Sequence, residues 1–342
     1  MTDLVAPPPT PRDRLQQLLL GYRVSQGLMV AAKLGLADLL AAGPQDCTAL
    51  AQATGTHAPS LYRLLRLLAS AGVFAEDGQH RFHLTPPAEL LRSDVDGTLR
   101  HMAMFLGEES HWRPWGELLH SVRTGETAFG HLYGLGHFAY LARHPEEAAT
   151  FDAFMVDQTA HAATAIVSAY DFAGVGTVVD VGGGRGTLLA AILTAYPALR
   201  GILFDQPQVL EGARALLEAS GVASRCDRVG GDFFQAVPTG GDTYLLQQIL
   251  HDWDDERAQR ILECCHAALP PAGRLLIVER LIPPGNAPSP AKSVDMQMLV
   301  ILGGRERSEV EYADLLAGAG LRLVRVLPTR SPFSILEAQR AD

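Results

Sequence analysis

The sequence predicts an α/β protein with a helical N-terminal part and a doubly wound parallel sheet in its C-terminal part. Up to about residue 168 the chain is rich in Ala and Leu at helical spacing. From Gly176 onward, short β-branched runs alternate with helical stretches, which is the order expected for parallel strands joined by helices. The length of 342 residues also favours two domains, which we place at 13–168 and 169–342.

The N-terminal part begins with a stretch, residues 1–12, that we expect to be a disordered lead-in. Its prolines, at positions 7, 8, 9 and 11, oppose regular structure. An amphipathic helical stretch then covers Leu15–Ala42 and ends at the Gly43-Pro44 pair. Thr48 is expected to cap a short helix over Ala49–Thr54.

Residues from about 44 to 92 have the element order of a winged helix. A second helix is predicted over Ser60–Ala71, followed by a hairpin whose strands Val73–Ala75 and Arg81–Leu84 flank an Asp-Gly turn. A DNA-reading helix carries basic and amide side chains to base edges, but this one offers only Arg63 and Arg66. We therefore favour packing against a partner subunit or the second domain, and a ligand-sensing DNA-binding protein stays the alternative.

The C-terminal part is predicted to contain seven strands and four helices. The expected strands are Thr177–Val181, Gly201–Asp205, Arg225–Val229, Thr243–Leu250, Arg274–Val278, Leu321–Leu327 and Phe333–Ala338. The expected helices are Thr187–Tyr196, Gln208–Ser220, Asp254–Ala268 and Ser308–Ala319. Only the short PTRSP segment separates the last two strands, so the final strand must run antiparallel to the one before it.

Composition excludes several classes of protein. Lys plus Arg is 28 and Asp plus Glu is 38, a net charge of −10 that disfavours nucleic acid as a partner. The four cysteines form no CxxC pair, so we expect free thiols and a cytoplasmic location. There is no apolar signal segment and no stretch of membrane-spanning length, so no membrane partner is expected.

The string VVDVGGGRGTLL, residues 178–189, ends a predicted strand and opens a helix. Gly182, Gly184 and Gly186 let the backbone turn sharply and approach a ligand without Cβ interference. Thr187 stands where a dinucleotide fingerprint has its last glycine, and Asp180 suits a cationic or amine-bearing ligand better than a pyrophosphate. A nicotinamide-dependent oxidoreductase is therefore the less favoured alternative.

Polar and aromatic residues follow the next two strands. Asp205, with Gln206 beside it, lies about 20 residues past the glycine loop, where an acidic side chain accepts hydrogen bonds from ribose hydroxyls. After the third strand, Gly231 precedes Asp232 and Phe233, which offer a polar contact and a stacking face to an adenine ring. Together these segments predict an adenosine pocket at the carboxyl ends of the strands.

The ordered motifs VDVGGGRG, LFDQP, GDFF and LHDWDDE, after a helical domain, resemble the plant-caffeic-acid-type O-methyltransferases. Bacterial members of that family act on secondary metabolites. The resemblance covers nearly the whole chain and implies a Rossmann-like methyltransferase domain that binds S-adenosylmethionine. It further implies a homodimer formed through the N-terminal domain, a small aromatic acceptor and no metal ion, as in enzymes of antibiotic biosynthesis.

His251 is the candidate for the group that removes a proton from the acceptor hydroxyl. It follows the fourth strand and precedes a helix, at the rim where α/β sheets place active sites. The resemblance makes this position the catalytic base, flanked by Glu279 and Glu306, whose carboxylates would raise the imidazole pKa and fix its tautomer. Asp252 is expected to be structural or to face the cofactor, because adjacent side chains seldom point at each other.

One position departs from the family pattern. Family members often have a lysine four residues before the catalytic histidine, where it meets the cofactor carboxylate; this chain has Gln247, followed by Gln248. A neutral amide contributes hydrogen bonds but no charge, and Arg185 of the glycine loop is a possible substitute. A methyltransferase relative that binds cofactor without catalysis is therefore a further alternative.

Two apolar stretches are candidates for the acceptor pocket. Phe151 and Met155 are one helical turn apart on one face, and the resemblance implies that this pair clamps the flat ring of the acceptor. Ordinary core packing is the alternative interpretation for such residues. The remaining candidates are Met102, Phe105, Trp112, Asp295 and Met298.

Overall fold

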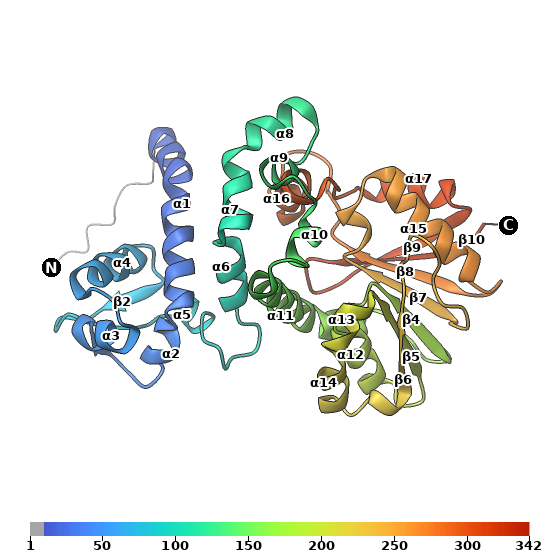
Figure 1. Cartoon of the computed structure of the whole chain (residues 1–342), viewed down its shortest axis with the longest axis horizontal. Coiled ribbons are helices and arrows are strands. Elements are labelled where there is room, and N and C mark those ends of the chain that lie inside the picture. Colours follow the sequence, from blue (N-terminus) through green and yellow to red (C-terminus); the bar gives the residue numbers. More distant parts are fainter. Residues whose placement is uncertain (1–9, 342) are drawn as a thin grey trace. The chain divides into compact units, whose positions relative to one another are not determined.

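The computed structural model describes residues 10–341, and its helices and strands are shown in Figure 1. Two compact units can be distinguished, Met1–Trp112 with Glu146–Asp157 and Arg113–Pro145 with Gln158–Asp342. This division falls earlier in the chain than the predicted one between residues 168 and 169. Helix α11 (Pro145–Ala169) contributes residues to both units.

In the first unit, helix α1 (Pro11–Lys33) begins one residue before the predicted end of the lead-in, at residue 12. Thr10 and Asp13 form a capping box, and Pro11 occupies the first turn, where its missing N–H costs no hydrogen bond. Residues 1–9 of the predicted lead-in lie outside the described residues. Expecting Pro11 to oppose helix formation was therefore wrong.

The predicted helix Leu15–Ala42 is divided into α1 and α2 (Leu36–Leu40) because Gly35 adopts a left-handed φ of 63°. The next helix, α3 (Cys47–Thr54), is capped by Asp46, not by Thr48 as predicted; the Asp46 carboxylate accepts from the backbone N–H of Ala49. The remaining elements of this segment are α4 (Ala58–Ser70), β1 (Gln45–Asp46), β2 (Phe74–Glu76), β3 (Arg81–Leu84) and α5 (Pro86–Glu89). The strands form a small sheet in the order β1-β3-β2.

The second unit contains a seven-stranded sheet in the order β6-β5-β4-β7-β8-β10-β9. Its strands are β4 (Thr177–Val181), β5 (Arg200–Asp205), β6 (Cys226–Gly230), β7 (Thr243–Gln247), β8 (Arg274–Glu279), β9 (Leu321–Pro328) and β10 (Ser334–Arg340). The first five are parallel, whereas β10 is antiparallel to both β8 and β9, which confirms the predicted fold class.

Helices cover both faces of this sheet because the strand residues alternate between two apolar clusters. Val178 of β4 packs with α11 and α12 (Thr187–Ala195), whereas Val179 packs with α15 (Asp255–Ala268) and α17 (Glu309–Gly318). The predicted helix Gln208–Ser220 is divided at Gly212 into α13 (Pro207–Glu211) and α14 (Ala213–Ala219).

The remaining helices are short. They are α6 (Arg100–Leu106), α7 (Glu109–Gly116), α8 (Leu118–Thr124), α9 (Ala128–Tyr133), α10 (His137–Leu141) and α16 (Pro290–Gln297). Two irregular turns complete the chain, a 3-10 turn at Leu250–Asp252 and a π-helical turn at Met298–Leu302. Of the helices within residues 10–341, none combines the length and apolarity needed to cross a bilayer.

The position of the site follows from the strand order. The chain winds outward from β4 in one direction through β5 and β6, and in the other through β7 and β8. The carboxyl ends of β4 and β7 therefore meet at the point where the strand order reverses, the usual ligand crevice of such sheets. The glycine loop follows β4, and the segment that contains His251 follows β7.

Candidate active site

His251 lies in the 3-10 turn after β7 and is only 6% exposed. Strand β7 ends at Gln247, three residues before the predicted end, because Gln248 turns the backbone into the left-handed region with a φ of 53°. Glu279, at the end of β8, then stabilises the turn. One of its carboxylate oxygens accepts from the backbone N–H groups of Ile249 and Leu250, both at 3.1 Å.

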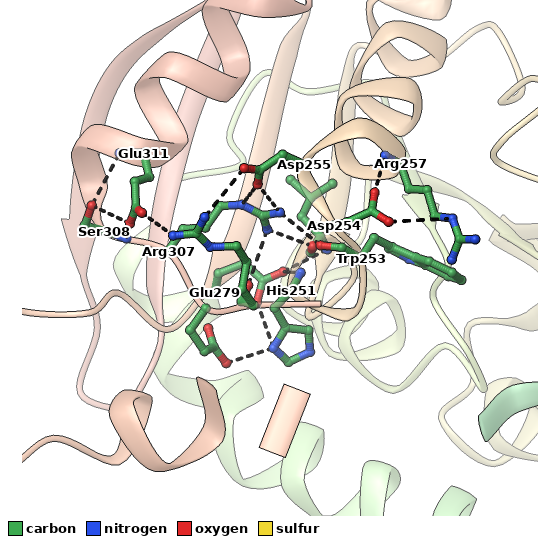
Figure 2. Close-up of polar contacts among 12 residues, drawn as sticks. His251, Trp253, Asp254, Asp255, Arg257, Glu279, Arg307, Ser308 and Glu311 are labelled. Carbon is green, nitrogen blue, oxygen red and sulfur yellow. Dashed lines mark hydrogen bonds and ion pairs between the residues drawn. The ribbon is translucent and has the colours of Figure 1, made fainter. Parts of the chain in front are cut away.

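The imidazole lies between two fully buried carboxylates (Figure 2). Its Nδ1 is 2.9 Å from Glu306 Oε1 and 3.6 Å from Glu279 Oε2. Since a carboxylate only accepts, the proton of a neutral ring stands on Nδ1 and the Nε2 lone pair is left to take up another proton. The structure thus brings together the three residues predicted to be catalytic.

Asp252 departs from the expectation that it would not point at its neighbour. Its Oδ1 is 3.3 Å from His251 Nε2, because the tight 3-10 turn brings adjacent side chains together. Burial raises the pKa of Asp252 to about 6, although the nearby imidazole opposes this shift. Asp252 is therefore a third carboxylate at the imidazole, on the side of the nitrogen that would take up the proton.

These charges control the protonation of His251. Burial disfavours the imidazolium, but the carboxylates of Glu279, Asp252 and Glu306 outweigh it and raise the pKa of His251 to about 10. Burial also raises the pKa of Glu279 to about 7, against the opposing effect of His251. His251 is therefore a much stronger base than an exposed histidine, close in proton affinity to a phenolate, whose conjugate acid has a pKa of about 10.

Two residues of the segment GGRERS, residues 303–308, hold the turn that contains His251, and neither was predicted to do so. Arg307 is buried, and its guanidinium donates to the carbonyl oxygens of Leu250 and Trp253, both at 2.9 Å, and to Asp255 (Figure 2). A Cβ on Gly304 would lie 2.1 Å from the carbonyl oxygen of His251. The sequence carried no signal for either role, since both depend on contacts across about 50 residues.

The glycine loop has the conformation that its composition predicted. Gly182, Gly184 and Gly186 all have left-handed φ values, of 70°, 59° and 79°. A Cβ on Gly182 would lie 2.6 Å from Ile249, so a side chain there would fill the space between the loop and the segment after β7. Asp180 lies buried beneath this loop against Gly183, and burial raises its pKa to about 7.

The predicted adenosine-binding residues lie around the same loop. Asp205 accepts from the backbone N–H groups of Gly184, at 2.8 Å, and Gln206, at 2.6 Å. Gly231 continues the segment, its N–H donating to the carbonyl oxygen of Asp205. Asp232 is exposed, and its carboxylate accepts from the backbone N–H of Phe234.

The Phe233 ring is partly buried and lies beside Gly182, where a Cβ would be 3.4 Å from it. Gln247 donates to Thr159 of α11 at 3.4 Å. Arg185, the suggested substitute for the missing lysine, has its guanidinium beside Gly212, between α13 and α14. The binding roles of these residues stay predictions.

The candidate acceptor residues fall into the two compact units. In the first, the Phe105 ring is buried and lies 5.4 Å from that of Phe151, whereas Met102 and Trp112 are each 39% exposed and Met155 is partly buried. In the second, Asp295 accepts from the backbone N–H of Glu306 at 3.0 Å, and Met298 is buried in the π-helical turn. Asp295 thus holds the segment that presents Glu306, a role that the sequence did not indicate.

The three residues predicted to be catalytic also have the spacing of a metal site. Ligand atoms of His251, Glu279 and Glu306 lie within 4.8 Å of one another. One imidazole nitrogen and two carboxylates are a donor set that several divalent ions accept. The expected metal independence therefore stays a prediction, which removal of divalent ions by a chelator tests.

Comparison with known proteins finds relatives over nearly the whole chain. Residues 16–94 match an O-methyltransferase dimerisation domain, and residues 115–322 match an O-methyltransferase domain. The chain is 49% identical over 325 residues to the phenazine O-methyltransferase PhzM of Lysobacter antibioticus, covering 95% of each chain. The crystal structure of LaPhzM has a TM-score of 0.93 at 48% identity, covering 97% of this chain and 99% of that one.

A second solved structure contains ligands. NcsB1 of neocarzinostatin biosynthesis, crystallised in complex with S-adenosylmethionine and 2-hydroxy-5-methyl naphthoic acid, has a TM-score of 0.81 at 37% identity. The match covers 93% of this chain and 96% of that one. These similarities support neither a nicotinamide-dependent oxidoreductase nor a DNA-binding regulator.

Proposed function

Since the chain belongs to the S-adenosylmethionine-dependent O-methyltransferase family, we propose that His251 removes the proton from a hydroxyl of a small aromatic secondary metabolite. The observation that carries this proposal is the imidazole held through Nδ1 by a buried carboxylate, with Nε2 left to take up a proton. S-adenosylmethionine, when bound, would supply the methyl group to the acceptor oxygen in line, its S–CH3 bond breaking to leave S-adenosylhomocysteine, while His251 would hold the proton.

The residues around the glycine loop fit the cofactor. S-adenosylmethionine, when bound, supplies a methyl group already activated by its positive sulfur. Gly182, Gly184 and Gly186 would let the loop approach it closely, and Asp205 would accept from its ribose hydroxyls. Phe233, which borders the loop at Gly182, offers the face on which the adenine would stack.

Glu306 and Glu279 would position His251 and stabilise the imidazolium that forms on proton transfer. Asp252 would stabilise the same charge from the Nε2 side. These residues do not need to exchange protons with the acceptor, since their effect is electrostatic. Because a phenol and the His251 imidazolium are close in pKa, transfer between them costs little free energy.

We infer that the acceptor is aromatic and that the chain works as a homodimer. The names of the phenazine and naphthoic acid relatives support the first inference. The match to a dimerisation domain supports the second, as does the exposed apolar surface of α1, where Leu15, Leu18 and Leu19 are 59%, 79% and 66% exposed. The same proposal assigns dimerisation to the predicted domain 13–168 and cofactor binding to the predicted domain 169–342.

The test combines calorimetry with a transfer assay on the wild type, His251→Ala and the control His266→Ala, which removes another histidine from α15. All three proteins are expected to bind S-adenosylmethionine with equal affinity. His251→Ala should lose about 10²- to 10⁴-fold in methyl transfer to phenols, the usual contribution of a general base. Undiminished transfer by His251→Ala would reject the base assignment and favour an acceptor nitrogen, which needs less base catalysis.

A further inference from the structure

Arg280, directly after the end of β8, is a partly buried cation whose hydrogen-bond partners are neutral. Its Nη1 donates to Gln248 Oε1 at 3.1 Å, its Nη2 donates to Gln158 Oε1 at 2.6 Å, and its guanidinium lies 4.3 Å from the centre of the Phe333 ring. Within residues 10–341, no Asp or Glu side chain comes within the 4.0 Å of an ion pair with Arg280. The carboxylates of Glu306 and Glu279 act on the Arg280 guanidinium only from beyond ion-pair distance. A guanidinium has five N–H groups, so Arg280 keeps donors that a bound anion would accept from.

Gln248, which binds Arg280, is a second group with an unused donor. Its side chain is 5% exposed, and its Nε2 has no hydrogen-bond partner. Because a guanidinium only donates, the amide oxygen must face Arg280 and the amide nitrogen must face away. The backbone at Gln248 is held at a φ of 53°, a conformation that a non-glycine residue adopts only where surrounding contacts enforce it.

The two groups therefore present one charged and one neutral set of donors. Gln248 Nε2 has no acceptor, and Arg280 uses its guanidinium on two neutral amide oxygens. They lie at the carboxyl ends of β7 and β8, beside the turn that contains His251. Two hydrogen bonds connect these strand ends to α11. Gln247 donates to Thr159, and Arg280 donates to Gln158. Gln247 is also the position where the family pattern has a lysine, so Arg280 provides a positive charge close to where one is missing.

We propose that Arg280 and Gln248 form a binding site for the carboxylate of a bound small molecule. The planar guanidinium and the amide N–H group match the two oxygens of a carboxylate. This inference rests on the proposed function, which offers two sources of the carboxylate, the methionine part of the cofactor and an acid group on the aromatic acceptor.

The test uses pairs of ligands of which one member has a carboxylate and the other lacks it; in the cofactor pair the amino group is lost as well. S-adenosylhomocysteine is paired with 5′-methylthioadenosine, which has the nucleoside and the sulfur but no carboxylate; 1-hydroxy-2-naphthoate is paired with 1-naphthol. Affinities are measured by calorimetry for the wild type, Arg280→Gln and the control Arg274→Gln. The control removes an arginine from the other end of β8, where Tyr170 and Glu337 are its partners.

Arg280→Gln should weaken one carboxylate-bearing ligand about 10- to 100-fold and leave its carboxylate-free counterpart within twofold. Selective loss of S-adenosylhomocysteine identifies the cofactor as the source, and selective loss of hydroxynaphthoate identifies the acceptor. Equal losses within each pair, or no loss in either, overturn the proposal. Failure of the wild type to bind S-adenosylhomocysteine would instead contradict the proposed function.

A measurement without ligand tests the shared anion site when the naphthol compounds bind too weakly for calorimetry. Gln248→Glu places a carboxylate beside Arg280, so it should raise the Tm of the unliganded protein and weaken binding of the carboxylate-bearing ligand. The gain in Tm should disappear when Gln248→Glu is combined with Arg280→Gln, and should persist when it is combined with Arg274→Gln. A change in Tm that is independent of Arg280 would show that Arg280 and residue 248 do not share an anion site.

Discussion

At the scale of single residues, burial lowers the pKa of the His251 imidazole, whereas three nearby carboxylates raise it. The carboxylates prevail and raise the pKa of His251 to about 10. The raised pKa has a cost at neutral pH, where most of the imidazole is protonated and unable to accept a proton. It also has a benefit, because the small neutral fraction is a strong base for a phenol. The balance between these effects sets the pH dependence of the reaction.

We expect kcat/KM for a phenol of pKa about 10 to rise with pH from about 7 towards 10, because the neutral fraction of a group with a raised pKa grows as pH approaches that pKa. The measurement is a pH–rate profile for this phenol and for a nitrophenol that is already ionised near pH 7. The nitrophenol needs no base, so its profile should be flat over the same range. A flat profile for both acceptors would contradict the assignment.

Glu306→Gln refines this prediction. The amide keeps an acceptor for Nδ1–H but removes the charge, so the His251 pKa should fall and the rising limb should move to lower pH. The maximal rate should fall as well, since the imidazolium loses a stabilising carboxylate. Glu309→Gln, on the exposed start of α17, is the matched control and should leave the profile in place.

At the scale of elements, the turn that contains His251 depends on a segment distant in sequence. Arg307 binds two carbonyl oxygens of the turn and its following residues, and the backbone at Gly304 packs directly against His251 and Asp252. Two helices begin next to these contacts. Asp254 caps the start of α15 and Ser308 caps the start of α17, and both capping residues are labelled in Figure 2. Disturbing this contact should therefore affect both stability and catalysis.

Gly304→Ala places a methyl group 2.1 Å from the His251 carbonyl oxygen, so the turn must shift. We expect a destabilisation of about 1–3 kcal/mol, typical of overpacking, and a loss in kcat with little change in affinity for the cofactor. Chemical denaturation and calorimetry measure these quantities. Gly116→Ala, where no other group lies within 4 Å of the added methyl, should change neither. Equal effects of the two substitutions would show that the close approach at Gly304 does not matter.

At the scale of the whole molecule, the exposed leucines of α1 indicate a partner surface. Leu18→Glu puts a charge in the middle of this apolar face and should convert a homodimer into monomers, as measured by sedimentation at micromolar concentration. Leu119→Glu is the control, because Leu119 of α8 is similarly exposed but lies outside the matched dimerisation domain. An unchanged dimer in Leu18→Glu would place the interface elsewhere.

The whole enzyme is expected to work without a metal ion, even though the three residues predicted to be catalytic could hold one. Incubation with a chelator followed by gel filtration should leave methyl transfer unchanged, because a proton on Nδ1 already links His251 to Glu306. Elemental analysis of the purified protein provides an independent measurement. Activity that is lost on chelation and restored by a divalent ion would assign His251, Glu279 and Glu306 to a metal centre instead.

Much of the fold could be predicted because it depends on local patterns. The parallel strands follow from β-branched runs, and the antiparallel β10 follows from the short connection after β9. The errors have local physical causes as well. Apolar periodicity predicted two continuous helices, which the structure shows to be interrupted at Gly35 and Gly212. The cap of α3 was assigned to the wrong residue because the choice depends on which side chain reaches a free backbone N–H group.

The sequence by itself determined the glycine loop, the alternation of strands and helices along the chain and the position of His251 directly after a strand, because each depends on residues close together in the chain. Only the tertiary structure decided which groups surround the imidazole. Asp252 reaches it through a 3-10 turn, and Arg307 and Gly304 hold that turn from about 50 residues away. Such contacts arise from the packing of separate elements and leave no periodic pattern in the sequence, so spacing alone could not reveal them.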